Sequence, residues 1–230
     1  MSVESPSYAR QAYNLEISEL EHDLLDMGSR AEQMVAMAVD SLCSLNVDQA
    51  RAVMLRDDDI DERDLAIEAK CLRLLALQQP MAGDLRQIGT AMKMITDIER
   101  VGDLSVDIAK ITLKVEKEFG QTSFIDIPKM AKVAGLMLHE ALEAYVHRDL
   151  NRVQEVCERD EEVDALYREL RSQIFANMVD DPSQVVADGW LLMAIHHVER
   201  IADHAVNIAE RVNFMVTGEF KLLAKQSDGN

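Results

Sequence analysis

The chain has 230 residues, of which 48% are hydrophobic and only 4% aromatic, and 13 are methionines. This is enough apolar material for a packed core, and flexible aliphatic side chains favour a helical bundle over a pleated sheet. Forty-two acidic and 24 basic residues give a net charge of −18, which argues against binding to nucleic acid or directly to lipid headgroups. The same charge attracts metal ions and basic protein surfaces.

The N-terminal residues lack the basic and apolar regions of a signal peptide, and no stretch of about 18 uninterrupted apolar residues occurs. We therefore expect a cytoplasmic protein without direct membrane insertion. The three cysteines, Cys43, Cys71 and Cys157, are an odd number without CxxC spacing. They are expected to be buried structural thiols rather than a disulfide framework.

Three long helices are predicted in the first half of the chain. Apolar residues recur at steps of three and four from Ile17 to Leu45, which indicates a helix of about 30 residues. Asp48 is expected to cap a second helix, which Pro80 ends, and a third is expected over residues 84–117. Three helices joined by short turns predict an up-down-up bundle.

The pattern repeats after a stretch that is rich in turn formers, residues 120–128 (GQTSFIDIP), in which Asp126 and Pro128 form a helix start signal. A further helix is expected from near Asp149, and the last one ends at Gly218. The chain is therefore divided into a first three-helix repeat at 1–119, a linker at 120–127, a second three-helix repeat at 128–220 and a C-terminal tail at 221–230.

The repetition is literal in two places. Residues 56–61 (RDDDID) are echoed by 159–164 (RDEEVD), and residues 98–103 (IERVGD) are echoed by 198–203 (VERIAD). Internal similarity of this kind is the signature of a repeat architecture. The predicted fold class is therefore all-α, with two tandem three-helix bundles, six long helices in total, related by an internal pseudo-twofold axis and packed into one elongated body.

Four pairs of acidic residues lie at matching positions on the second and third helices of the two repeats. Residues four apart share a helix face, so each pair presents two carboxylates side by side. If neighbouring helices bring two pairs together, the carboxylates suit a divalent or trivalent metal ion such as iron, zinc, manganese or magnesium. The predicted metal ligands are Asp57, Asp61, Glu99 and Asp103 in the first repeat and Asp160, Asp164, Glu199 and Asp203 in the second.

A solvated acidic face is the alternative, since Arg100 and Arg200 lie beside the glutamates and can neutralise them. His196 can join the second cluster, whereas the first repeat has Thr96 at that position. A ferritin-like oxidase needs Glu-x-x-His on two helices, and this sequence has one instance, which begins at Glu19. Because no catalytic triad, glycine-rich phosphate loop or HExxH motif occurs, no enzyme activity is expected.

The LLDMG run at residues 24–28, the QPMAGDLR run at 79–86 and the two Glu-Arg-(Val/Ile)-(Gly/Ala)-Asp motifs resemble the PhoU family, over nearly the whole chain. The resemblance implies two symmetric three-helix bundles, and paired E(D)xxxD motifs bind metal in some members. It also implies a negative regulator of phosphate uptake and phosphate-starvation signalling, an adaptor between the phosphate ABC transporter and a sensor histidine kinase. We expect a homodimer that associates with the inner membrane only through its protein partners.

The sequence departs from the family pattern at Ala202, where many relatives have glycine, and at Asn207, where the first repeat has Asp107. Both changes lie in the second repeat, so its metal site is the one they affect. Two rival functions stay open: a helical carboxylate protein that buffers metal or performs redox chemistry, and a purely structural scaffold. No basic pocket for a free anion is evident, so no direct phosphate binding is expected.

Overall fold

The computed structural model describes residues 6–78, 80–119 and 126–219. Within these ranges the chain is helical and has no strand, which confirms the predicted all-α class. None of the helices in this part of the chain is long and apolar enough to cross a lipid bilayer. The elements are α1 (Pro6–Ser44), α2 (Val47–Met54), α3 (Asp57–Gln78), α4 (Gly83–Phe119), α5 (Ile127–His147), α6 (Leu150–Asp180), the 3-10 turn η1 (Pro182–Gln184) and α7 (Val185–Thr217).

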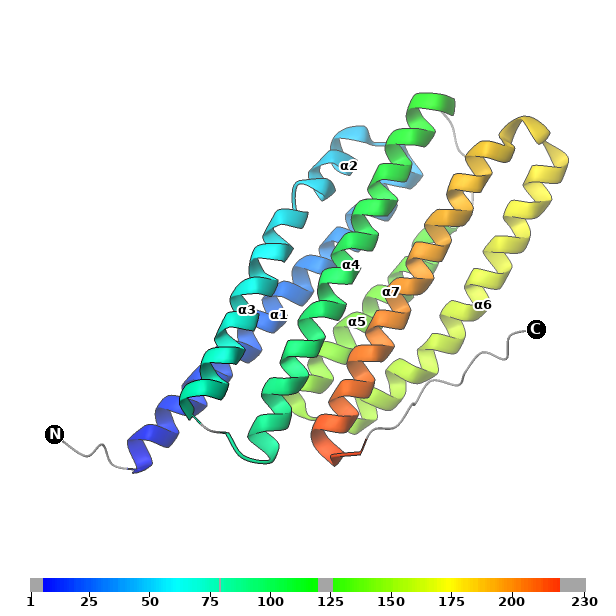
Figure 1. Cartoon of the computed structure of the whole chain (residues 1–230). Helices are drawn as coiled ribbons and strands as arrows, with labels where there is room; N and C mark the ends of the chain where they lie inside the picture. The colour runs from blue at the N-terminus through cyan, green and yellow to red at the C-terminus, as the bar shows by residue number, and fades with distance from the viewer. Residues whose placement is uncertain (1–5, 79, 120–125, 220–230) are drawn as a thin grey trace.

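The helices form one elongated bundle (Figure 1). Helices α1, α4, α5 and α7 make up its centre, where α1 packs against α4 and α5, and α7 packs against the same two helices. On the outer flanks, α3 covers α1 and α4, while α6 covers α5 and α7. The buried side chains form one continuous hydrophobic core with members from both halves. The two three-helix bundles therefore share an interior.

The second helix of the first bundle is interrupted, which the sequence analysis did not predict. Helix α2 ends at Met54 and α3 begins at Asp57, whereas the equivalent helix α6 is continuous. The first turn of α3 consists of three aspartates, whose carboxylates interact favourably with the amide groups at a helix N-terminus. Within the described residues, the six predicted long helices are therefore confirmed, and the short helix α2 is added to them.

Most of the predicted helix ends are confirmed. Asp126 and Asp149 cap α5 and α6 by accepting hydrogen bonds from amides in the first turn of each helix. Gly218 follows α7 with a φ of 79°, in the left-handed region that glycine adopts without strain. The cap of α2 is Asn46 and not Asp48 as predicted, because Asp48 already lies inside the first helical turn.

The predicted domain limits fall partly outside the described residues. Residues 120–125 of the predicted linker lie outside them, and so does the predicted tail at 221–230. The described part of the first repeat contains α1 to α4, and that of the second contains α5, α6 and α7. Helix α5 begins one residue before the predicted start of the second repeat, at Ile127.

The three thiols differ in exposure. Cys71 is buried and Cys157 is partly buried, but Cys43 is exposed. The prediction of a buried thiol is therefore wrong for Cys43. The buried side chains next to it are those of Ser41 and Leu42, so Cys43 lies on the side of α1 that faces solvent.

Helices α1 and α5 approach each other closely at Gly28. A Cβ atom at this position would lie 2.1 Å from Cδ1 of the buried Leu142, far inside van der Waals contact. A side chain at this position would therefore force the packed Leu142 side chain to move. Further along the two helices is a cavity of about 320 Å³, lined by side chains that include Val35, Val39 and Ala131.

Candidate functional site

The predicted ligands of the first repeat meet between α3, which carries Asp57 and Asp61, and α4, which carries Glu99 and Asp103. Burial and the charges of Asp61 and Asp103 raise the pKa of Asp57 above its usual value. Burial and the same two aspartates also raise the pKa of Glu99. The carboxylates therefore act on one another electrostatically, although within the described residues no three of them stand close enough together to hold a metal ion. We call these four residues the first carboxylate cluster.

The predicted ligands of the second repeat meet in the same way between α6 and α7. Burial and the charges of Asp164 and Asp203 raise the pKa of Asp160 to about 6. Burial and the charge of Glu199, with a smaller contribution from Asp164, raise the pKa of Asp203 to about 6. The pKa of Glu199 is raised by burial, Asp164 and Asp160. We call these four residues the second carboxylate cluster.

Arg100 partly neutralises the first carboxylate cluster. Its Nη1 atom lies 2.6 Å from Oδ2 of Asp103, and its Nε atom lies 3.4 Å from Oε2 of Glu99. The positive charge of Lys110 also acts on the cluster, since it lowers the pKa of Asp57 against the other influences. The arginine-neutralised acidic face, which was the alternative from sequence, is thus present in the first repeat.

The second carboxylate cluster lacks the equivalent ion pair. Among the described residues, no ion pair joins Arg200 to Glu199 or Asp203, although its charge lowers the pKa of both. The Nδ1 atom of His196 lies 3.2 Å from Oε2 of Glu199. That oxygen is buried and accepts no hydrogen bond within the described residues. A buried carboxylate oxygen without a donor is a place where a cation fits.

The side chains in both clusters are of the kind that binds metal ions. Each cluster offers four carboxylates whose repulsion a cation relieves, and the second has a buried oxygen that no protein group satisfies. Within the described ranges, however, no three Cys, His, Asp or Glu side chains stand close enough together to hold a metal ion as they are. Side chains must turn before an ion is bound, and the metal role of the eight residues remains a prediction.

The two departures from the family pattern have structural explanations. A Cβ atom on Gly102 would lie 3.4 Å from Cγ2 of Ile60, an ordinary contact, and its equivalent Ala202 is fully buried. A methyl group is therefore compatible with this helix spacing. Asn207 donates a hydrogen bond across the bundle to Oδ1 of Asp97, at 3.4 Å. It therefore serves the contact between α7 and α4 and not the second carboxylate cluster.

A second contact to Asp97 strengthens the link between the two repeats. Nδ1 of His204 lies 2.9 Å from Oδ1 of Asp97, and both side chains are largely buried. Sequence reasoning missed this pair, since 107 residues separate its members. The pair therefore forms a polar link between α4 and α7.

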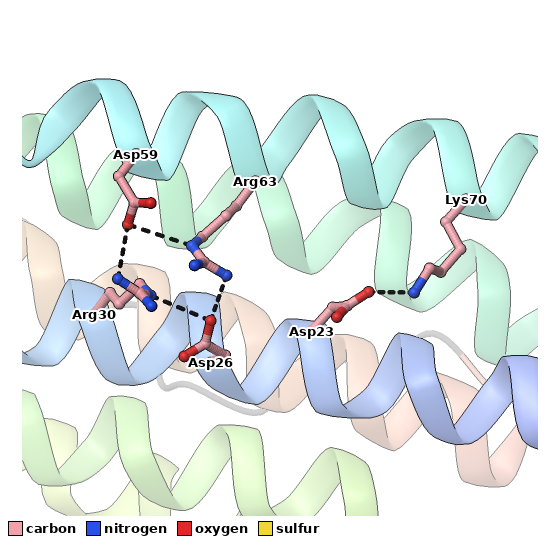
Figure 2. A network of polar contacts seen from close by, with 6 residues as sticks. All are labelled: Asp23, Asp26, Arg30, Asp59, Arg63 and Lys70. Atoms are coloured by element: carbon pink, nitrogen blue, oxygen red, sulfur yellow. Dashed lines mark hydrogen bonds and ion pairs between the residues drawn. The ribbon is translucent and has the colours of Figure 1, made fainter.

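An ion-pair ring holds α3 against α1 (Figure 2). Arg30 lies 3.2 Å from Asp26 and 3.1 Å from Asp59. Arg63 lies 3.3 Å from Asp59 and also pairs with Asp26, which closes the ring. Lys70 makes a further pair with α1. These contacts fix the helix that supplies two carboxylates to the first cluster.

Comparison with known proteins identifies the relatives of this chain. A model of the PhoU domain matches residues 24–112 and 127–212. A phosphate-specific transport system accessory protein PhoU homolog from Clostridium acetobutylicum is 36% identical, over 91% of this chain and 96% of the relative. One from Rhizobium meliloti is 34% identical, over 93% of this chain and 91% of the relative.

Solved structures agree with this result. The crystal structure of PhoU from Pseudomonas aeruginosa has a TM-score of 0.84 and 31% sequence identity, and the match covers 90% of this chain and 100% of that one. The phosphate transport system regulatory protein PhoU from Streptococcus pneumoniae has a TM-score of 0.83 and 31% identity, with 91% and 99% covered. The chain therefore belongs to the PhoU family, a family of regulatory accessory proteins and not of enzymes.

Proposed function

We propose that this protein is an accessory regulator of a phosphate-specific transport system, and that it represses phosphate uptake and phosphate-starvation signalling when phosphate is plentiful. The observation that carries the proposal is the match of both bundles, over nearly the full length of the chain, to relatives that are named accessory proteins of such a system. Because the likeness covers both repeats, the proposal concerns the whole two-bundle body and not one shared element.

The proposed mode of action is that of an adaptor between the phosphate ABC transporter and a sensor histidine kinase. An adaptor needs surfaces at a fixed separation and no catalytic centre. Two bundles with one continuous core make a stiff body with two related sides, and a net charge of −18 favours basic partner surfaces. In this proposal the protein is a cytoplasmic homodimer that reaches the inner membrane only through its partners.

Metal ions at the two carboxylate clusters are part of the proposed function. Burial and, after it, mutual repulsion raise the pKa of Asp57, Glu99, Asp160 and Asp203, and a bound cation would offset the repulsion. It would also change the charge that the outer helices α3 and α6 present to a partner. Regulation is therefore proposed to depend on the clusters, with iron, zinc, manganese or magnesium as the candidate ions.

An alkaline phosphatase assay tests the adaptor role. The gene is expressed in a bacterium that lacks its own copy and therefore produces the phosphatase even in high phosphate. The proposal predicts that this chain restores repression in high phosphate. Phosphatase activity that stays high, with the protein present and folded, would overturn the adaptor role.

The same strain separates the rival functions. A metal-buffering or redox protein of the helical carboxylate class would alter metal content or oxygen consumption without restoring repression. A purely structural scaffold would alter none of these quantities. Elemental analysis of the cells and the phosphatase assay together therefore assign the chain to one of the three functions.

A further inference from the structure

Helix α3 carries a second row of apolar side chains, on the side that faces away from the bundle. Its inner row, which includes Ile67, is buried where α3 packs against α1 and α4. Its outer row has four exposed residues at steps of four, three and four, Leu65, Ala69, Leu72 and Ala76. Leu65 is 64% exposed and Leu72 is 52% exposed. We call these four residues the outer seam, and a contiguous exposed apolar surface of this kind marks an interaction site.

The fold itself does not require an apolar outer seam. Helix α6 covers the second bundle as α3 covers the first, and residues 159–164 match residues 56–61. By this match, the first two positions of the seam correspond to Arg168 and Ser172, and the last two to Phe175 and Val179. A bundle of the same form is therefore built without apolar residues at all four positions.

The outer seam is complementary to itself in size. Its spacing is that of the a and d positions of a coiled coil, with leucine at d and alanine at a. In an antiparallel pair of helices, each a position lies opposite a d position of the other helix. Around a twofold axis between residues 70 and 71, Leu65 lies opposite Ala76 of a second copy, and Leu72 lies opposite its Ala69. Every layer then holds one large and one small side chain, which allows two helices to interdigitate closely.

The charges of α3 favour the same antiparallel arrangement. Residues 57–68 carry seven acidic side chains and one basic one, whereas residues 69–78 carry two basic side chains, Lys70 and Arg73, and no acidic one. Lys70 already pairs with α1, but Arg73 is 53% exposed, so its charge reaches the surface. An antiparallel second copy brings its basic half toward the acidic half of the first copy. A parallel pair would instead place the two acidic halves side by side.

The position of α3 leaves room for a second copy. Helix α3 lies on the outer flank of the body, with α1 and α4 behind it (Figure 1). The two bodies of a dimer would therefore lie on opposite sides of the helix pair. At about 1.5 Å per residue the outer seam is only about 16 Å long, which places the contact at the low end of specific interfaces. The expected dimer is weak, with a dissociation constant in the micromolar range.

We propose that the outer seam of α3 binds the outer seam of a second copy of this chain, as an antiparallel helix pair around a twofold axis. The same surface serves on both copies, as in most dimers of identical chains. The inference rests on the homodimer in the proposed function and names the surface through which that dimer forms. The α6 flank of each copy stays exposed at the two outer sides of the dimer.

Sedimentation equilibrium of the full-length chain, between about 1 and 100 μM, measures the dimer. Leu72→Glu puts a charged group into the two central layers and should raise the dissociation constant at least tenfold. Phe175→Glu is the matched control, since Phe175 holds the equivalent position of α6 and is 49% exposed. It should change the dissociation constant less than threefold. Circular dichroism confirms that each variant is folded.

A size exchange tests which residues face each other. Ala69→Leu places two leucines opposite each other in the central layers and should weaken the dimer at least tenfold. The addition of Leu72→Ala restores one large and one small side chain in each of these layers. The double variant should therefore return to within threefold of the dissociation constant of the wild-type chain.

A wild-type chain that is monomeric at 100 μM would overturn both this inference and the homodimer of the proposed function. A dimer that Leu72→Glu leaves intact, or that Phe175→Glu weakens as strongly, would overturn the inference alone, because another surface then forms the dimer. The antiparallel pairing is also wrong if Ala69→Leu dimerises like the wild-type chain or if the double variant is no tighter than Ala69→Leu. The adaptor role is judged separately by alkaline phosphatase repression.

Discussion

Replacing Asp160 and Asp203 together by asparagine should stabilise the metal-free protein at neutral pH. Both carboxyl groups have a pKa near 6 in the folded chain, against an ordinary value of 3.8. A carboxyl group whose pKa is raised by folding favours the folded state while it is protonated. That contribution is full below the unfolded pKa and is lost as the pH rises through about 6. Asparagine has nearly the same shape and helix propensity but no charge to repel its neighbours.

The size of the effect follows from the pKa change. At about 1.4 kcal/mol for each pKa unit, a group isolated in the interior would lose about 3 kcal/mol of folding free energy between acid and neutral pH. Asp160 is only half-buried and Asp203 is exposed on one side, so screening by water reduces this to about 1 kcal/mol for each group. The double variant should therefore gain about 1–2 kcal/mol at pH 7.5, or roughly 2–8 °C in melting temperature.

Urea unfolding followed by circular dichroism, with a chelator present, measures the difference. The advantage of the double variant should shrink by about half between pH 7.5 and pH 5, because the wild-type cluster then takes up protons. Glu162→Gln, an exposed acidic position on the same helix, is the matched control and should change stability by less than about 0.5 kcal/mol. Equal stability of variant and wild-type protein at pH 7.5, or an advantage that does not depend on pH, would show that the charges of Asp160 and Asp203 do not destabilise the folded chain.

Three further predictions concern other parts of the molecule. Gly28→Val should lower the free energy of unfolding in urea by about 1–3 kcal/mol, because its side chain clashes with Leu142. Leu142→Ala should lower the stability of the wild-type chain but hardly change the stability of the Gly28→Val variant. A double-mutant cycle with Asp26→Asn and Arg63→Gln should give a coupling of about 0.5–1 kcal/mol that falls in 1 M salt; a coupling independent of salt contradicts an electrostatic origin. Calorimetry should detect no micromolar phosphate binding to the metal-free chain, because its net charge of −18 repels anions.

The helical architecture was predictable because periodicity and repetition are local properties of the chain. The apolar seam of the first helix alternates by three and four residues, and its central members, such as Leu24 and Met34, are fully buried. The matching motifs at 98–103 and 198–203 placed both acidic pairs on equivalent helices. The packing of α3 against α4 puts these pairs on neighbouring helices, as expected, but among the described residues no three carboxylates stand close enough together to hold an ion.

The interruption at Leu55 and Arg56 was not predictable from apolar spacing. Neither leucine nor arginine ends a helix by its own chemistry. The row of apolar residues also continues after the interruption, at Ile60. A signal was present in the three aspartates that follow, because acidic residues are favoured in a first turn. In the second repeat the equivalent run is RDEEVD, and helix α6 continues through it.

The contacts that distinguish the two clusters depend on side-chain directions that sequence spacing does not contain. Arg100 and Arg200 occupy equivalent positions, yet only Arg100 forms ion pairs with its cluster among the described residues. His196 was noted as a candidate from its spacing of three from Glu199, and the structure adds the unsatisfied oxygen beside it. The pairing of Asp97 with the second repeat joins residues more than 100 positions apart and has no local signal.

In the proposed function, the carboxylate clusters carry the regulation. The most direct test expresses a chain with Glu99→Gln, Asp103→Asn, Glu199→Gln and Asp203→Asn in the bacterium without its own copy and measures alkaline phosphatase in high phosphate. These changes keep the shape and remove the charge at both sites, so the variant should be folded and as abundant as the wild-type protein. The account predicts that phosphatase activity stays high. Repression as complete as that by the wild-type chain would contradict it.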